Sequence, residues 1–292
     1  MPSLTVRVLV DNNTLTDRFF TGEPGLSLYL ETDSRKVLFD LGYTGAFIAN
    51  ARKMGIDLLN LDYVVLSHGH IDHTGGLPHL IQLHLEAKIE HLPHKVPKIL
   101  VHPHCLYPRP FGRLFDIGSM IPYERLARYF PVEVSQAPVW IAGDLVFLGE
   151  IPREIAFPER PEVRKRMIAL PNSTSEDRLL DDTALAYRSP EGIVILTGCS
   201  HSGIANIIET AKKVCGDDRI LDIIGGLHLL DPSPGELAGT VGYLKKAGVR
   251  ALHPCHCTSL AAKSALAQAA PVHEVGVGLK LDYGREGDQP LA

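Results

Sequence analysis

The ten residues SHGHIDHTGG, numbered 67–76, place four groups that can bind a metal ion within six consecutive positions. These groups are His68, His70, Asp72 and His73. The residues just before them, DYVVLS, predict a buried strand, so the four groups fall in a loop that a strand holds rigidly. Packing of a strand or helix gives no reason for three histidines in so short a loop. The stretch therefore predicts one half of a metal site.

The residue types and their spacing favour a transition metal. His68 and His70 are two positions apart, so their side chains point the same way in extended backbone. Asp72 and His73 follow a bend in the chain and can reach a neighbouring position. Imidazole and carboxylate together suit zinc, iron or manganese rather than calcium. The alternative is a set of surface histidines beside a helix that Asp72 caps. Capping explains Asp72 but not three histidines.

Composition narrows the class of protein. The chain has 292 residues, enough for one large domain or two modest ones, and 45% of them are hydrophobic. The net charge of −5 gives no reason to expect nucleic acid or an acidic membrane as a partner. The N-terminal residues MPSLTVRVLV do not resemble a signal peptide, and no apolar segment approaches the roughly 18 residues of a membrane span. We expect a small-molecule substrate, and both a monomer and a homo-oligomer are compatible with the sequence.

The cysteines indicate a reducing compartment. Their number is odd, and they are spread along the chain at Cys105, Cys199, Cys215, Cys255 and Cys257. A secreted disulfide framework has an even number at regular spacing. We therefore expect a cytoplasmic protein.

Apolar periodicity predicts an α/β fold, because strands and helices alternate along most of the chain. Hairpins are expected at 26–40 and 183–198. The other predicted strands are 4–10, 62–67, 219–226, 249–254 and 273–284, and the predicted helices are 44–54, 75–87, 203–215, 235–248 and 259–270. Residues 88–170 are rich in proline and contain short strands such as KILVH. We interpret them as an insertion or small subdomain within a single domain that spans residues 1–292.

The pattern H-x-H-x-D-H at 68–73, its preceding strand and the following T-G-G resemble the signature of the metallo-β-lactamase superfamily. The segment KVLFDLG, which contains Asp40, resembles the strand that ends in Asp near the metals of that family. The resemblance implies an αββα sandwich with one or two metal ions at one edge. Zinc is the expected metal, and iron and manganese are the alternatives. The resemblance covers most of the chain in order, with 88–170 the poorest match.

The resemblance also implies ligands from the C-terminal half. ILTGCSHSG matches the family's T-G-D step with Cys199 at the Asp position, and HPCHCT matches a P-G-H-like turn with His256. The histidine that the family carries just before TALAY is absent, and the chain has Asp181 and Asp182 there. We therefore expect His201 to supply the missing imidazole. The strands VVLS and VILT both lead into ligand-bearing turns, so the two turns are expected to face each other.

The predicted centre has two metal ions. Three imidazoles bind the first, from His68, His70 and His201. The second is bound by Asp72, His73 and His256. Cys199 is near both, either as a thiolate ligand or as a small buried residue in a tight turn.

Some of these residues have simpler interpretations. His256 could be a structural histidine between two cysteines, and His201 could cap a helix. Asp40, Asp182 and His228 are expected to contact the substrate or the ligands, although a lone histidine after a strand, such as His228, is as often structural.

The expected activity is metal-assisted hydrolysis of an ester, thioester or phosphoester. Two metals roughly 3.5–4 Å apart can bridge a water and turn it into hydroxide near neutral pH. Asp72 is the expected catalytic residue, because it would hold the second metal and orient that hydroxide. His70 argues against an oxygen-reducing diiron protein of this fold, which usually has Glu there. The chain also lacks the strongly basic surface expected of a nuclease.

The alternative is a transferase. The combination of SHGHIDHTGG, GCSHSGIANI, IGGLHL and HCT resembles a narrower branch, the 7,8-dihydropterin-6-yl-methyl-4-(β-D-ribofuranosyl)aminobenzene 5′-phosphate synthases. The resemblance implies transfer of a dihydropterin from its diphosphate to an aminobenzene ribosyl 5′-phosphate, as in methanopterin biosynthesis. The basic run PERPEVRKRM at 158–167 would bind such phosphates, or it is a solvated face.

Overall fold

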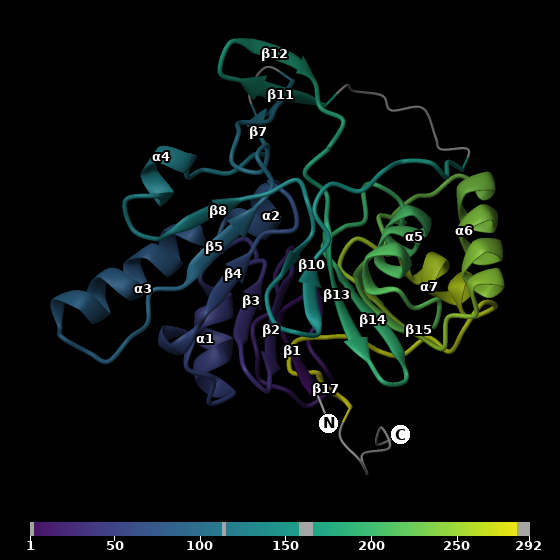
Figure 1. Ribbon diagram of the computed structural model, residues 1–292, viewed down its shortest axis with the longest axis horizontal. Helices are drawn as coiled ribbons and strands as arrows, with labels where there is room; N and C mark the ends of the chain where they lie inside the picture. The colour runs from purple at the N-terminus through teal and green to yellow at the C-terminus, as the bar shows by residue number, and fades with distance from the viewer. Residues whose placement is uncertain (1–2, 113–114, 158–165, 285–292) are drawn as a thin grey trace.

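Two β-sheets face each other, and helices cover both outer faces (Figure 1). The computed structural model describes residues 3–112, 115–157 and 166–284. The first sheet has seven strands, in the spatial order β17 (Lys280–Tyr283), β1 (Leu4–Val10), β2 (Ser27–Thr32), β3 (Lys36–Phe39), β4 (Tyr63–Val65), β5 (Lys98–Val101) and β8 (Val132–Val134). The second has six, in the order β16 (Ala251–Cys255), β15 (Ile220–Gly226), β14 (Gly192–Thr197), β13 (Ala184–Ser189), β10 (Leu145–Phe147) and β9 (Val139–Trp140).

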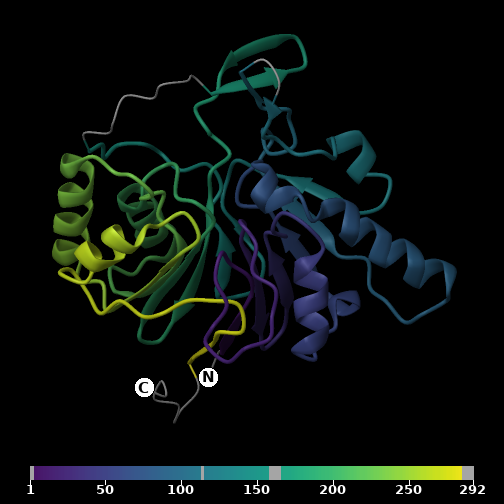
Figure 2. The same ribbon diagram turned by 180° about the vertical axis from the view of Figure 1, so that it is seen from behind.

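The helices divide between the two faces (Figures 1 and 2). On the side of the first sheet lie α1 (Ala46–Lys53), a 3-10 turn (Leu58–Asn60), α2 (Ile71–Thr74), α3 (Leu77–Ile89) and α4 (Tyr123–Leu126). On the side of the second lie α5 (Ile204–Cys215), α6 (Pro234–Ala247) and α7 (Leu260–Leu266). No helix in the described ranges is long and apolar enough to cross a membrane.

The core consists of three apolar layers, which is the packing of an αββα sandwich. One layer fills the space between the sheets, and the other two lie between a sheet and its helices. Strand alternation produces this division, since Val194 and Leu196 of β14 face the first sheet whereas Ile193 and Ile195 face the helices. The strand is apolar on both faces because both are buried. The predicted α/β sandwich is therefore confirmed.

The direction of the strands brings the loops that carry the predicted ligands to one edge of the sandwich. β3, β4, β5 and β8 are mutually parallel, and so are β14, β15 and β16. β1 runs in the direction of β3, because both are antiparallel to β2. The segments that leave the carboxyl ends of these strands emerge together, which is where open α/β sheets place their sites.

Residues 88–170 contribute to both sheets. β5 and β8 extend the first sheet, and β9 and β10 extend the second. Two small two-stranded sheets lie outside this frame, β6 (Pro110–Phe111) with β7 (Phe115–Asp116), and β11 (Met167–Leu170) with β12 (Ser173–Glu176). The segment predicted as an insertion thus contains strands of the sandwich, and its domain boundary stays a prediction. The predicted strand 273–284 is a strand only over β17, and the predicted helix 259–270 ends at Leu266.

One buried hydroxyl in the core allows a test of this packing. Tyr187 is fully buried between the sheets, and its hydroxyl has no hydrogen-bond partner among the described residues. Removing an unsatisfied buried hydroxyl relieves its desolvation cost, so Tyr187→Phe should raise the free energy of unfolding by about 1 kcal/mol. Denaturant unfolding measures this. Tyr29→Phe is the control, because the Tyr29 hydroxyl donates to Glu31 at 3.3 Å and its loss should not stabilise the protein. A less stable Tyr187→Phe protein would contradict the packing.

Candidate metal centre

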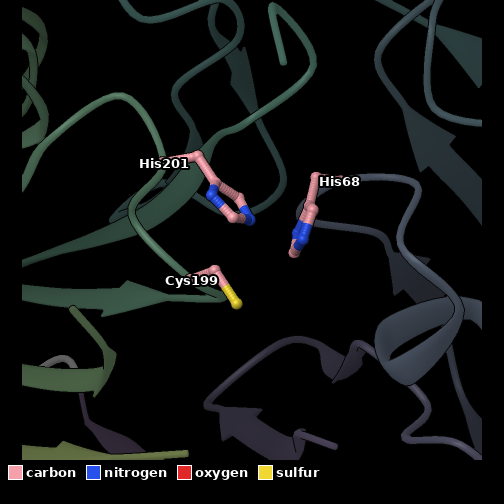
Figure 3. Close-up of side chains that lie close together, drawn as sticks. All are labelled: His68, Cys199 and His201. Atoms are coloured by element: carbon pink, nitrogen blue, oxygen red, sulfur yellow. The ribbon is translucent and has the colours of Figure 1, made fainter. Parts of the chain in front are cut away.

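Two groups of potential metal ligands lie at the shared edge of the sheets. The His68 cluster consists of His68, Cys199 and His201, and the His256 cluster consists of His73, Cys199 and His256. Within each cluster the ligand atoms all lie within 4.8 Å of one another. Figure 3 shows His68 reaching from one side toward Cys199 and His201 on the other. The predicted facing of the two turns is confirmed, and Cys199 is the residue that both clusters share.

The other two predicted ligands lie beside the clusters to which they were assigned. His70 Nδ1 is 3.0 Å from His68 Nε2. One carboxylate oxygen of Asp72 is 3.3 Å from His256 Nε2 and 3.8 Å from His73 Nε2. All seven predicted ligands therefore gather at one place, while their division between two ions stays a prediction.

The donor set fits metal ions. His70 Nε2 and His201 Nε2 are buried, and neither has a hydrogen-bond partner among the described residues. Burial lowers the pKa of His68 well below its usual range and that of His70 to about 3, so both imidazoles are neutral. Neutral imidazoles with unshared lone pairs are the form that binds a cation. Polar atoms buried without partners are costly, and a bound cation would satisfy them.

A buried carboxylate and a hydroxyl orient two of the imidazoles. Asp40 accepts hydrogen bonds from the Ser67 hydroxyl at 2.6 Å and from the Ser67 backbone N–H at 2.7 Å. His73 Nδ1 lies 2.7 Å from the same carboxylate, and His68 Nδ1 lies 2.9 Å from the Ser67 hydroxyl. If both Nδ1 atoms carry the proton, Nε2 of each ring is left free for the cluster. Asp40, predicted near the metals, thus lies behind the ligands and acts on them through His73 and Ser67.

The segment directly after β1 holds His256, and the sequence alone did not predict this contact. The carboxylate of Asp11 accepts a hydrogen bond from the His256 backbone N–H at 2.8 Å. Asn12 Oδ1 lies 3.2 Å from His256 Nδ1, and Asn12 Nδ2 donates to the His256 carbonyl at 3.2 Å. His256 has a φ of 51°, which costs energy for a residue other than glycine and needs such support. The polar DNN directly after the first strand was the available signal.

The two remaining predicted neighbours have different surroundings. Asp182 accepts hydrogen bonds from the Ser202 backbone at 2.9 Å and its hydroxyl at 2.6 Å, and burial raises the pKa of Asp182 to about 6. It therefore contacts the loop of His201. The His228 ring lies 4.3 Å from the His201 ring, centroid to centroid, and its backbone N–H donates to Cys257 Sγ at 3.2 Å. His228 is thus adjacent to the His68 cluster.

The basic run at 158–167 lies largely outside the described residues. Arg160, Arg164 and Lys165 lie outside the described residues. Arg166 is described, and its Nη1 is 3.5 Å from His201 Nδ1.

Comparison with known proteins agrees with this geometry. Residues 20–140 match the metallo-β-lactamase superfamily. The uncharacterized protein MJ0448 of Methanocaldococcus jannaschii is 30% identical over 264 residues, which cover 90% of this chain and 94% of that protein. The 7,8-dihydropterin-6-methyl-4-(beta-D-ribofuranosyl)-aminobenzene-5'-phosphate synthase of the same organism is 29% identical over 255 residues, 84% of each chain.

A solved structure extends the similarity to the whole chain. Tm1679, described as a metal-dependent hydrolase of the beta-lactamase superfamily, has a TM-score of 0.80 and 28% identity, and the match covers 97% of this chain and 100% of that one. The chain belongs to the metallo-β-lactamase superfamily.

The shared position of Cys199 gives a spectroscopic prediction. Burial raises the pKa of the Cys199 thiol well above its ordinary value, and a cation beside the sulfur would favour the thiolate. The cobalt-loaded protein should show a thiolate-to-cobalt charge-transfer band that Cys199→Ser removes. Cys215→Ser, a buried cysteine on α5, is the control and should keep the band. A band that persists in Cys199→Ser would assign it to another thiol.

The contact between Asn12 and His256 gives a second prediction. Asn12→Ala removes the acceptor that fixes the His256 ring, so the affinity for one metal ion should fall by about tenfold. Titration with cobalt in competition with a chelator measures this. The neighbouring substitution Asn13→Ala is the matched control. Equal affinities in wild type and Asn12→Ala would show that the ring needs no such support.

Proposed function

We propose that this protein is a metal-dependent hydrolase that cleaves an ester, thioester or phosphoester bond in a small, anionic molecule. The observation that carries the proposal is the pair of ligand clusters joined by Cys199. The similarity to Tm1679, itself described as a metal-dependent hydrolase, supports it. The five free, buried cysteines suit a reducing compartment, so we also propose that the protein acts in the cytoplasm.

The proposed ligands are the residues of the two clusters together with His70 and Asp72. These residues would hold divalent cations, zinc being the first choice, and the cations would supply Lewis acidity and a nucleophilic water at neutral pH. Of these ligands Asp72 is accessible, with 33% of its side chain exposed. Burial by itself would raise the pKa of Asp72, but His73 and His256 beside it hold that pKa below its usual range. Asp72 is therefore a carboxylate that can accept a hydrogen bond from water and orient it toward the substrate.

Positive charge beside the His68 cluster supports an anionic substrate. The Arg166 guanidinium lies 3.5 Å from His201 Nδ1. An arginine can bind a phosphate or carboxylate through two parallel hydrogen bonds. A phosphorylated substrate would thus be held on the side of His201, with the bond to be cleaved near Cys199.

A second candidate is the transferase reaction. The 29% identity to the methanopterin-pathway synthase over 84% of both chains favours it. In that reaction a C–N bond would form between the aminobenzene nitrogen and the pterin methylene carbon as diphosphate leaves. The same centre could stabilise the leaving diphosphate, since metal ions stabilise the developing charge on leaving oxygens.

Activity assays on the metal-loaded protein separate the two candidates. The panel comprises phosphodiesters, acyl esters and acyl thioesters, beside a dihydropterin diphosphate offered with an aminobenzene ribosyl phosphate. We expect hydrolysis in at least one class, reduced about 100-fold or more in Asp72→Asn and unchanged in the exposed control Asp218→Asn. C–N transfer without any hydrolysis would make the transferase the better assignment. Equal hydrolysis by wild type and Asp72→Asn would exclude the proposed role of Asp72.

A further inference from the structure

We infer that Asp181, Asp182 and Thr183 form a clamp that positions the two loops of the His68 cluster. The first loop carries His68 and His70 after β4, and the second carries Cys199 and His201 after β14. Since the clamp would act on metal binding, this inference rests on the proposed metal centre.

Asp181 holds the first loop. One of its carboxylate oxygens accepts a hydrogen bond from the Gly69 backbone N–H at 2.8 Å, and Gly69 stands between His68 and His70. The loop is also confined from behind, because a Cβ on Gly69 would lie 1.9 Å from the Cys105 carbonyl oxygen. The Asp181 side chain is fully buried, so this hydrogen bond has no competition from solvent.

Arg109 supplies the charge that lets Asp181 stay buried. Its Nη2 donates to the Asp181 oxygen that binds Gly69, at 2.6 Å, and its Nε donates to Asp177 at 2.9 Å. Arg109 itself is 1% exposed, and it also donates to the carbonyls of His104, Cys105 and Tyr107. A buried charge is tolerated when it is paired with an opposite charge at short range, as Asp181 is with Arg109. The clamp therefore includes a fixed cation, paired with Asp177 and Asp181.

Asp182 and Thr183 complete the connection. Asp182 accepts both hydrogen bonds of Ser202, the residue after His201, at 2.6 and 2.9 Å. The Thr183 backbone N–H donates to the Ser67 carbonyl, immediately before His68, at 3.0 Å. Three consecutive residues thus contact both loops. Because adjacent Cα atoms are about 3.8 Å apart, the segment sets how far the loops can separate.

This clamp occupies the position where the family pattern carries a histidine ligand. Each aspartate uses one oxygen on a loop, and neither belongs to the His68 or the His256 cluster. The other oxygen of each, Oδ1, is buried without a hydrogen-bond partner among the described residues. The chain would then have exchanged a ligand for a positioning pair, with His201 beside it as the imidazole. The His256 cluster has its own support from Asp11 and Asn12 and shares only Cys199 with the loop that Asp182 holds, so the clamp should affect the ion of the His68 cluster more than the other ion.

The test is cobalt binding to the full chain, with circular dichroism to establish folding. Asp181→Asn and Asp182→Asn should weaken the binding of the ion in the His68 cluster by about 10–100-fold and the binding of the other ion by clearly less. Asn12→Ala should lower the affinity for the ion in the His256 cluster. His201→Ala identifies which cobalt absorption band belongs to the His68 cluster. Asp218→Asn, an exposed aspartate, is the matched control.

The outcomes distinguish this inference from the proposed centre. Wild-type affinity for both ions in folded Asp181→Asn and Asp182→Asn proteins would overturn the clamp, as would equal weakening of both ions. If Asp181→Asn does not fold because Arg109 loses one of its two carboxylate partners, Asp182→Asn and Ser202→Ala decide, since both leave the pair of Arg109 and Asp181 intact. A wild-type protein that binds no cobalt, zinc, iron or manganese would overturn the metal centre and the clamp together.

Discussion

Buried aspartates hold each of the ligand-bearing loops by accepting hydrogen bonds from its backbone. Asp40 binds the N–H of Ser67, Asp181 that of Gly69, Asp182 that of Ser202 and Asp11 that of His256. Backbone N–H groups in irregular, buried loops have no strand partner, so a carboxylate satisfies them at short range. The loops come from two different sheets, and these contacts set their conformation. The separation of the imidazoles follows from that arrangement.

Strained backbone occurs in the same region, where hydrogen bonds support it. Asp40, Ser200, His228 and His256 all have positive φ angles, between 51° and 61°. Such conformations cost energy in residues other than glycine, and they persist where surrounding hydrogen bonds over-determine them. The buried aspartates also concentrate negative charge in a region with little water, and Cys199 adds to it if its thiol ionises. Arg109 offsets part of that charge, and cations in the clusters would offset more.

Much of this arrangement could be predicted because strong local signals carried it. The hairpin pattern at 183–198 and the helical spacing at 203–215 indicated β13, β14 and α5, and the density of ligands at 68–73 indicated a metal. His201 and Cys199 could be found since they follow a strand as His68 does. The contribution of residues 88–170 to both sheets could not be predicted from the sequence. The reason is that β5, β8, β9 and β10 are short strands whose pairing depends on distant partners.

The sequence by itself determined the α/β class, the superfamily and the residues that can bind metal, because strand alternation and ligand spacing are local properties. Tertiary structure decided what those residues do together. It made Cys199 common to both clusters, turned Asp181 and Asp182 toward the loops, and brought Asp11 to His256 across 245 positions. The physical reason is that parallel strands from two sheets end at one edge, so the partners of each ligand are set by strand order and not by distance along the chain.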